Sequence, residues 1–372
     1  MKKTEIQKGK IMRYRFLSNI FIFLLLTGNI SGQAFSENRT FRKSVSVNRD
    51  MTLEVNNKYG SVHISSGSAD SVSIKAEVSA TGPSLDRIDK MLQGVTVNIS
   101  ETNYTVKAQT DFNQTLSMLL EGFKSITNKL IPYESRIQIN YIIEAPEYLN
   151  IRIINKYGDV YLENTSGDLS VELSNGSFKA NSVTGSSNMN FNFCDVTINN
   201  LKEARLDATF SELVIGESGN LTLSSVSSRF DLKKSKILST KSRRDKFFIG
   251  SIGSLTGNSY FSEYRIENLE KELILDSKYG SIEADHVDNG CDAINLTTGY
   301  TDVYLTFDSQ SSYNFDVRSV NTFLVLPKDR TDAEKETVNE DRKEYITSGR
   351  VGKNPGSLKV IIEATRGNIY LK

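Results

Sequence analysis

A short motif with an alternating apolar pattern recurs along the chain. It reads NKYGSVHI at 57–64, NKYGDVYL at 155–162, SKYGSIEA at 277–284 and TGYTDVYL at 298–305. In each copy, two apolar residues flank a polar or amphipathic one, and this period of two is typical of a strand with one buried face. The pattern therefore predicts short strands, each entered through the same kind of corner.

The motif repeats at a nearly constant interval. Its first apolar residue falls at Val62, Val160, Phe178, Val196, Leu213, Phe230, Phe247, Tyr264, Ile282, Val303, Phe323 and Ile369. From Val160 to Phe323 the steps are 18, 18, 17, 17, 17, 17, 18, 21 and 20 residues. A unit this small cannot bury its apolar face alone, so successive units must stack around a shared core. The sequence predicts an all-β fold, a β-solenoid with rungs of 17–21 residues that each supply about two strands and two corners.

An aromatic residue recurs three positions before the first apolar residue. It is found at Tyr59, Tyr157, Phe193, Phe210, Phe261, Tyr279 and Tyr300, and a small or turn-forming residue usually follows it. If equivalent residues stack, they form a ladder along one edge. We expect Phe210 and Tyr279 to stack on their neighbours, and we expect Phe210→Ala to cost about 3–5 kcal/mol if the ring is buried.

Two segments depart from the repeat. Residues 83–135 contain two apolar stripes at helical spacing, in SLDRIDKMLQGV and QTLSMLLEGFKSITNKLIP, and predict a helix-containing insertion that caps an open edge. A partner-binding or membrane-surface helix is the alternative. Residues 329–356 mix charges of both signs and predict a solvated excursion. The other expected parts are the first strands and N-terminal rung at 35–82, the solenoid at 136–328 and its final strands at 357–372.

The first 34 residues have the layout of a secretory signal peptide. Six basic residues and one acid precede or enter the apolar run FLSNIFIFLLLTGNI, and small residues follow it. This predicts a start at Met1 or Met12, cleavage near Gly32 or Ala34, and no membrane insertion after cleavage; a retained N-terminal anchor is the alternative. The expected location is the periplasm, the cell surface or the extracellular space. Removing this segment leaves 39 basic and 44 acidic residues, hence a net charge of −5, which favours neither nucleic acid nor anionic lipid as a partner.

The sequence offers few candidates for catalysis. His63 is expected on the outward side of a strand and His286 in a turn, so neither is placed against a nucleophile. A polysaccharide-degrading β-helix would need clustered carboxylates, and the polar positions before the strands supply Asp159, Asp195, Glu212, Asp245, Glu263 and Asp302. Ser, Arg and Lys interrupt this series, and acids are common beside tight corners. The sequence therefore assigns no catalytic, cofactor-binding or metal-binding residue.

The two cysteines are expected to be unpaired. Export makes a disulfide the default for such a pair, but Cys194 and Cys291 fall five repeats apart. At a strand spacing of about 4.8 Å they would be separated by roughly 24 Å, against a limit of about 7 Å between the Cα atoms of a disulfide. The register predicts two free thiols, and Cys194 in its corner is expected to be a buried or half-buried structural thiol.

The motifs also resemble a known family. The YGDVYL-type motif, the EAP turn before it in IIEAPEYLNIRIINKYGDV (142–160) and the closing ATRGNIYL resemble the adhesin-like domain family of unknown function that is common in Bacteroidetes. The resemblance implies a β-solenoid outside the cytoplasm and brings no functional residues with it. The expected function is a non-enzymatic envelope or surface module that binds a polymer or a protein. The alternatives are a carbohydrate-active enzyme, either a lyase or a hydrolase, and a structural or sensory periplasmic component.

Overall fold

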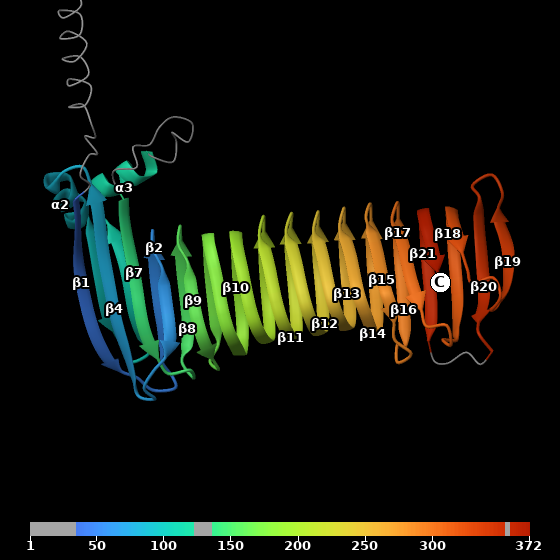
Figure 1. The fold of residues 1–372 in the computed structure, drawn as a ribbon, viewed down its shortest axis with the longest axis horizontal. Helices are drawn as coiled ribbons and strands as arrows, with labels where there is room; N and C mark the ends of the chain where they lie inside the picture. The colour runs from blue at the N-terminus through green and yellow to red at the C-terminus, as the bar shows by residue number, and fades with distance from the viewer. Residues whose placement is uncertain (1–34, 123–135, 354–357) are drawn as a thin grey trace, which may run out of the picture. The chain divides into compact units, whose positions relative to one another are not determined.

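The computed structural model describes residues 35–122, 136–353 and 358–372, and these residues form an all-β protein with two short helices (Figure 1). The expected signal peptide lies outside the described residues. The chain divides into two compact units. Unit 1 takes in the described parts of 1–39, 79–94 and 114–137, and unit 2 takes in 40–78, 95–113 and the described parts of 138–372. The all-β class predicted from the alternation is confirmed.

The helices are α2 (Leu85–Gln93) and α3 (Gln114–Gly122). The first strands are β1 (Phe35–Ser46), β2 (Thr52–Lys58), β3 (Val62–Ser66), β4 (Ser71–Gly82), β5 (Val95–Glu101), β6 (Thr105–Phe112), β7 (Arg136–Ala145), β8 (Asn150–Lys156) and β9 (Val160–Thr165). The central strands are β10 (Leu169–Thr209), β11 (Glu212–Val226), β12 (Arg229–Arg243), β13 (Lys246–Tyr260) and β14 (Glu263–Lys278). The last strands are β15 (Ser281–Val287), β16 (Ala293–Gly299), β17 (Asp302–Phe307), β18 (Tyr313–Val325), β19 (Thr331–Asn339), β20 (Glu344–Val351) and β21 (Lys359–Leu371). Within the described ranges, no helix is long and apolar enough to span a membrane.

Strands β10 to β14 pair in parallel and follow one another in chain order (Figure 1). Leu213 pairs with Phe230, Phe230 with Phe247, and Phe247 with Tyr264. These residues are separated by one repeat of the sequence motif, so the predicted register is the observed one here. Each of β11 to β13 contains two runs of alternating buried residues, separated by a break near its middle.

Three of the four positions of the NKYG motif have a structural cause. The amide Nδ2 of Asn155 donates a hydrogen bond to the carbonyl oxygen of Gly60 over 3.0 Å, and Asn155 is fully buried. Tyr157 has a φ of 60°, which turns the chain through the left-handed region. A Cβ atom at Gly158 would collide with the carbonyl oxygen of Gly60, so only glycine fits in this corner. The motif therefore recurs because each corner lies directly on the preceding one.

Other corners replace the glycine with a residue whose side chain bonds to the neighbouring corner. In this series, the backbone N–H of each corner residue donates a hydrogen bond to the side-chain oxygen of the next corner residue, at 2.7–3.2 Å. The residues, in order, are Cys194, Ser211, Ser228, Asp245 and Ser262. These hydrogen bonds satisfy buried N–H groups that the turn leaves without a strand partner. Serine and aspartate at this position are thus structural.

Three rings form a stack inside unit 2. Phe230 and Phe247 have ring centroids 4.8 Å apart, Phe247 and Tyr264 4.6 Å apart, and all three are at most 1% exposed. The hydroxyl of Tyr264 lies 3.1 Å from Thr240 Oγ1, which satisfies its polar end. We call these residues the interior stack.

The C-terminal strands depart from the order of the sequence. Strand β21 pairs in parallel with β17 on one side and with β18 on the other, so the last strand of the chain lies between two earlier ones. Strand β20 then pairs antiparallel with β18, and β19 pairs antiparallel with β20. The charged segment 329–356 therefore contains two strands. The side chains of β19 are almost all exposed, which keeps this charged edge strand in water.

The sequence register is wrong by one residue in β18. The period predicts Phe323 as the first inward residue, but Phe323 pairs with Asn368 and is 61% exposed, whereas Leu324 pairs with Ile369. The cause is the corner residue Asn321, which has a φ of 49° and takes the left-handed position that an aromatic residue occupies in other repeats. The corner therefore lies one residue later than the regular spacing indicates.

The long insertion after β3 does not separate its flanking repeats. Strand β3 pairs directly with β9, and Val62 lies opposite Val160. Residues 95–112 form the antiparallel strands β5 and β6, which the helical stripes did not predict, and β6 pairs in parallel with β2.

The first predicted helix is observed as α2, in which Ile88, Met91 and Leu92 are buried, but Leu85 is exposed and Val95 begins β5. In the second predicted helix, α3 ends at Gly122. The predicted positions Phe123, Ile126 and Leu130 lie outside the described residues.

Candidate functional site

A depression of about 770 Å³ lies on the outward-facing side of β2, β8, β10 and β11. We call it the outer-face hollow. Its outward-facing lining residues are Thr52, Glu54, Asn150, Arg152, Asp168, Ser170, Ser186, Asn188, Glu203, Arg205, Asn220 and Thr222. They alternate with inward residues such as Ile151, Leu169 and Ala204, which are buried. The alternation that builds the core thus also lines the hollow with hydrogen-bonding groups.

The register places these side chains in rows across the strands. Thr52 on β2 lies opposite Asn150 on β8. Arg152 on β8 lies between Glu54 on β2 and Ser170 on β10. At the far end, Glu203 lies opposite Asn220 and Arg205 opposite Thr222. An extended ligand that crosses the strands would therefore meet a hydroxyl, amide or charged group at each strand step of about 4.8 Å.

The hollow contains charges of both signs. Glu54, Asp168 and Glu203 are its acids, and Arg152 and Arg205 are its bases. Arg152 forms an exposed ion pair with Glu172 at 3.5 Å. Within the described part of the chain, Arg205 forms no ion pair, so its five N–H donors face solvent. This lining suits a polar ligand with many hydroxyl groups better than a strongly charged one.

The aromatic ladder predicted from the sequence is present in pieces. Tyr59 stacks on Tyr157 at 5.4 Å and Phe193 on Phe210 at 5.1 Å. Phe261, Tyr279 and Tyr300 form a longer run, which we call the corner stack, with centroids 4.9 and 5.0 Å apart. Asn175, Ser227 and Arg244 interrupt the ladder at the same left-handed corner position.

Phe210 stacks on Phe193 as predicted, but the burial on which the larger stability effect depended is not observed. Its side chain is 54% exposed because the left-handed corner points the ring away from the core. In the corner stack each ring also covers the face of the next, with interplanar angles of 19° and 17°. Sugars and nucleobases bind aromatic side chains through a free ring face. The corner stack presents mostly ring edges, so it is a weak candidate for such a ligand.

The predicted carboxylates do not form one catalytic cluster. Asp159 and Asp302 each accept a backbone N–H from the neighbouring strand, at 2.8 Å in both cases, and Glu263 forms an ion pair with Lys246 at 3.3 Å. Asp195 and Glu212 occupy paired positions on β10 and β11, where both are exposed. Neither belongs to the lining of the outer-face hollow.

Asp245 lies in a different place from the other predicted carboxylates. It is only 1% exposed, and its carboxylate accepts hydrogen bonds from Ser225 Oγ at 2.7 Å, from the N–H of Ser228 at 2.7 Å and from the N–H of Arg243 at 2.9 Å. Burial raises the pKa of this carboxyl group, although the hydrogen bonds act in the opposite direction. Ser225 and Ser228 flank the preceding corner, and Arg243 precedes the corner of Asp245 itself. The carboxylate therefore links two successive corners and faces no ligand.

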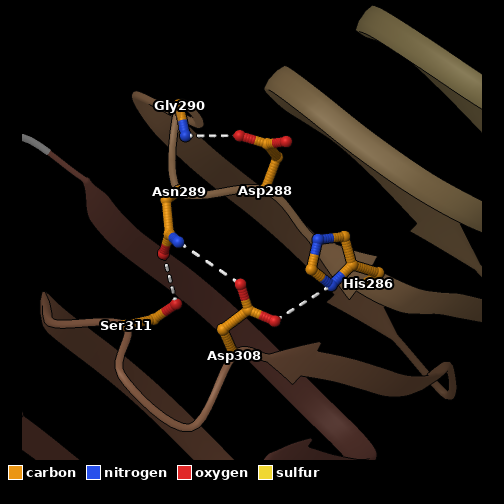
Figure 2. Close-up of polar contacts among 6 residues, drawn as sticks. All are labelled: His286, Asp288, Asn289, Gly290, Asp308 and Ser311. Carbon is orange, nitrogen blue, oxygen red and sulfur yellow. Dashed lines mark hydrogen bonds and ion pairs between the residues drawn. The ribbon is translucent and has the colours of Figure 1, made fainter.

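His286 belongs to a polar cluster that joins two turns (Figure 2). Its Nδ1 lies 3.4 Å from Asp308 Oδ1, and Asn289 Nδ2 donates to Asp308 Oδ2 at 3.3 Å. Ser311 Oγ donates to Asn289 Oδ1 at 2.7 Å. In a nucleophilic triad, the imidazole lies between the acid and the serine. Here, Asp308 and Asn289 lie between His286 and Ser311, so the cluster links the turns and does not activate the serine.

The remaining predicted positions are also accounted for. His63 is exposed on the outward side of β3, as expected, and its ring lies 5.9 Å from that of Tyr161. His286 is in β15, close to its end, and is not in the turn. No group of three or more His, Cys, Asp or Glu residues in the described ranges could hold a metal ion.

Cys194 and Cys291 are free thiols, as the register predicts, and both are buried. Burial raises the pKa of the Cys194 thiol, and it raises that of Cys291 to about 11. Both residues are therefore protonated thiols at neutral pH and poor nucleophiles.

The outer-face hollow was not predicted from the sequence. Its signal is the run of polar residues at the outward positions of successive repeats, for example Asn150, Asp168, Ser186 and Glu203. Polar residues are expected at every outward position of a strand with one buried face, so this run does not stand out without the structure.

Comparisons with known proteins give no family for the chain. No protein-family model matches it, and no curated protein matches its sequence. Among solved structures, it is similar to a putative cell adhesion protein from Clostridium sporogenes, with 9% identity, a TM-score of 0.18 and coverage of 90% of this chain and 99% of that one. It is also similar to a putative adhesin from Parabacteroides distasonis, with 9% identity, a TM-score of 0.28 and coverage of 90% and 97%. A putative lipid binding protein from the same organism has 10% identity, a TM-score of 0.30 and coverage of 75% and 95%. These scores are too low to bear on function.

Proposed function

We propose that the protein is an exported, non-enzymatic binding module built on a β-solenoid, and that its outer-face hollow binds an extended, hydroxyl-rich polymer of the envelope or the extracellular space. The solenoid assignment is supported by the parallel register of β10 to β14, in which residues one repeat apart lie opposite each other. Export is supported by the signal-peptide layout of residues 1–34.

One observation carries the proposed site. The hollow is lined by outward hydroxyl, amide, guanidinium and carboxylate groups from successive parallel strands, and its apolar residues are the buried ones between them. A repeating polar chain laid across the strands can form the same kind of hydrogen bond at each step. Many weak bonds along a regular surface give affinity through their number, which suits a polymer better than a small molecule.

The placement of the carboxylates favours binding over catalysis. A glycosidase needs two carboxyl groups on either side of the bond that is cleaved, one of them usually with a raised pKa. Asp245, whose pKa is raised by burial, lies among corner residues, and Asp195 and Glu212 are exposed outside the hollow. The enzyme alternative therefore rests on exposed side chains alone.

A glycan array with the purified exported protein tests the proposal. We expect retention of one or more neutral polysaccharides, and we expect Arg205→Gln to weaken binding about tenfold, because a charge-assisted hydrogen bond contributes about 1.5 kcal/mol. Lys202→Gln is the matched control. This residue is exposed on the same strand three positions earlier and does not line the hollow, so its change should alter affinity less than about twofold.

The other functions predict different outcomes. Release of shortened sugar products that is abolished in the D195N/E212Q variant would establish the enzyme alternative. Failure of every glycan to bind, together with normal folding, would favour a structural or sensory component.

A further inference from the structure

One segment of unit 2 carries a concentration of positive charge. Residues 229–246 contain eight basic residues, Arg229, Lys233, Lys234, Lys236, Lys241, Arg243, Arg244 and Lys246, and only two acids, Asp231 and Asp245. The flanking segments 218–228 and 247–262 contain no charged residue at all. Parallel pairing places these uncharged segments on the two sides of β12. Residues 235–243 of β12 therefore have uncharged partners on both neighbouring strands, whereas Arg229 and Lys234 lie opposite the acids Glu212 and Glu217.

Some of these cations are partly neutralised. Lys246 forms an ion pair with Glu263 at 3.3 Å, and the guanidinium of Arg229 lies 4.1 Å from the centre of the Phe248 ring. Lys234 lies opposite Glu217. Of the five other cations, Lys233 and Lys236 lie near the middle of β12, whereas three lie together at its C-terminal end.

Lys241, Arg243 and Arg244 form what we call the basic corner. Lys241 lies between Ser224 and Asn258 on the neighbouring strands, and Arg243 lies between Val226 and Tyr260. All three basic side chains are exposed. Across the described ranges of the chain, none of the three forms an ion pair.

The backbone holds the basic corner in a defined geometry. Arg244 has a φ of 60°, and its N–H donates to the carbonyl oxygen of Tyr260 at 2.9 Å. The neighbouring carboxylate of Asp245 is directed inward and accepts the N–H of Arg243 at 2.9 Å. Asp245 is only 1% exposed, so a ligand in solvent meets the two guanidinium groups and not this carboxylate.

Clustered like charges repel one another, and an anionic ligand relieves that repulsion. Arginine forks bind carboxylates and sulfates through paired hydrogen bonds, and outward residues two positions apart on a strand are about 6.6 Å apart. Lys241 and Arg243 have this spacing, so successive acidic groups of a linear chain can reach both. The hydroxyl and amide groups of Ser224 and Asn258, on either side, can bond to uncharged parts of the same chain.

We propose that the basic corner binds an acidic polysaccharide, with uronate carboxylates on Lys241, Arg243 and Arg244. A single-stranded nucleic acid would need free ring faces for its bases. The ring of Tyr260, opposite Arg243, packs in T-shaped contacts against Phe261 and Tyr279, and these two rings cover each other. A membrane or a nucleic-acid duplex would need a broad basic face, but the strands on both sides of β12 are uncharged here. Access to such a polysaccharide rests on the export proposed above. The site shares no residue with the outer-face hollow, although Thr222 of the hollow lies two positions before Ser224 on β11.

The test measures binding of polygalacturonate to the purified exported protein over a range of salt concentrations. We expect binding that weakens as salt rises and at least a tenfold loss of affinity in the K241Q/R243Q/R244N variant. Any binding of neutral dextran by the outer-face hollow should be unchanged in this variant. Asparagine is chosen at 244 because it tolerates a positive φ. The control variant K156Q/K202Q/K359Q removes the same charge from exposed positions elsewhere and should change the affinity less than about twofold.

Several outcomes overturn the proposal. These are an equal loss of affinity in both triple variants, binding of polygalacturonate that does not weaken as salt rises, and equal or tighter binding of a single-stranded oligonucleotide or of vesicles containing anionic lipid. The basic-corner variant should retain the affinity of the outer-face hollow for its neutral polymer. The two sites are distinguished if the K241Q/R243Q/R244N variant loses polygalacturonate binding and keeps neutral-polymer binding. They are also distinguished if Arg205→Gln loses neutral-polymer binding and keeps polygalacturonate binding.

Discussion

The interior stack and the corner stack have the same ring spacing and opposite surroundings. Neighbouring rings are 4.6 and 4.8 Å apart in the interior stack and 4.9 and 5.0 Å apart in the corner stack. Both spacings follow from the distance between paired strands, which is about 4.8 Å. The interior rings are at most 1% exposed, whereas Phe261, Tyr279 and Tyr300 are 46, 40 and 46% exposed. Equal spacing therefore does not mean an equal contribution to stability.

The backbone adds a second difference. The three corner residues have φ values of 58°, 59° and 53°, in the left-handed region that costs a residue with a side chain roughly 1–2 kcal/mol. Ring stacking contributes about 0.5–1.5 kcal/mol. The two terms nearly cancel, so an aromatic residue at the corner stabilises the fold little, while the same ring in the interior stabilises it strongly.

The largest effect is expected in the interior stack. Phe247→Ala should lower the free energy of unfolding by about 3–5 kcal/mol, because it leaves a cavity between Phe230 and Tyr264. Chemical denaturation followed by circular dichroism measures this change. Lys179→Ala, on an exposed outward position, is the control and should stay within about 0.5 kcal/mol. A loss below about 1 kcal/mol in Phe247→Ala would mean that the three rings are not buried together.

The next effect concerns the close approach of one corner to another. Gly158→Ala should destabilise the protein by about 1–3 kcal/mol, because its Cβ would collide with the backbone carbonyl of Gly60, which cannot rotate away. Gly299→Ala is the matched control, since a Cβ there meets only the Lys278 side chain, at 3.5 Å. Equal melting temperatures for the two variants would contradict the direct stacking of the corners.

A smaller effect is expected at the exposed corner aromatics. Phe210→Ala should cost about 1 kcal/mol, well below the 3–5 kcal/mol of a buried ring, because only the contact with Phe193 is lost. Phe210→Gly should be no less stable than Phe210→Ala, since glycine adopts the φ of 49° without strain. Thermal unfolding of the Phe210→Ala and Phe210→Gly variants measures both effects. A loss of stability of about 3–5 kcal/mol in both variants would show that the ring is buried.

The smallest effect is a pH dependence at Asp245. Its pKa in the folded protein is raised above the ordinary value of 3.8, so the folded state holds this proton more tightly than the unfolded state. The resulting stability is fully present below pH 3.8 and is lost as the pH rises through the folded pKa. Asp245→Ser keeps an oxygen at the corner, as in Ser228 and Ser262, and removes this titration. The wild type should therefore lose stability relative to the variant as the pH rises through that range, and urea denaturation at several pH values measures the difference. If the difference in stability between the wild type and Asp245→Ser stayed the same at every pH, the pKa of this carboxyl group would not be raised by folding.

Much of the repeat could be predicted from residues that are close in the sequence. The alternation around Val160, Phe178 and Val196 predicts buried strands, and the constant interval predicts which residues lie opposite each other in β10 to β14. The same interval places Cys194 and Cys291 too far apart to pair. These predictions succeed because a period of two depends only on local backbone geometry, and a constant period leaves one way to stack the units.

The candidate sites could be predicted less well. The excess charge of residues 229–246 is visible in the sequence, but the uncharged neighbours of Lys241 and Arg243 are known only through the strand pairing. The outer-face hollow depends on side chains from Thr52 to Thr222, which the chain brings together over several repeats and one long insertion. No local pattern reports how such distant outward residues combine into one surface.

The remaining features depend on which segments meet in space. The sequence order places β21 last, yet it pairs between β17 and β18, and the corner at Asn321 shifts Phe323 outward. Similarly, an aromatic ring at Phe210 is compatible with either burial or exposure, and the left-handed corner selects exposure. Local alternation depends on the chain's own backbone, whereas strand neighbours and the direction of a corner depend on contacts between segments far apart in the sequence, and those contacts form only in the folded protein.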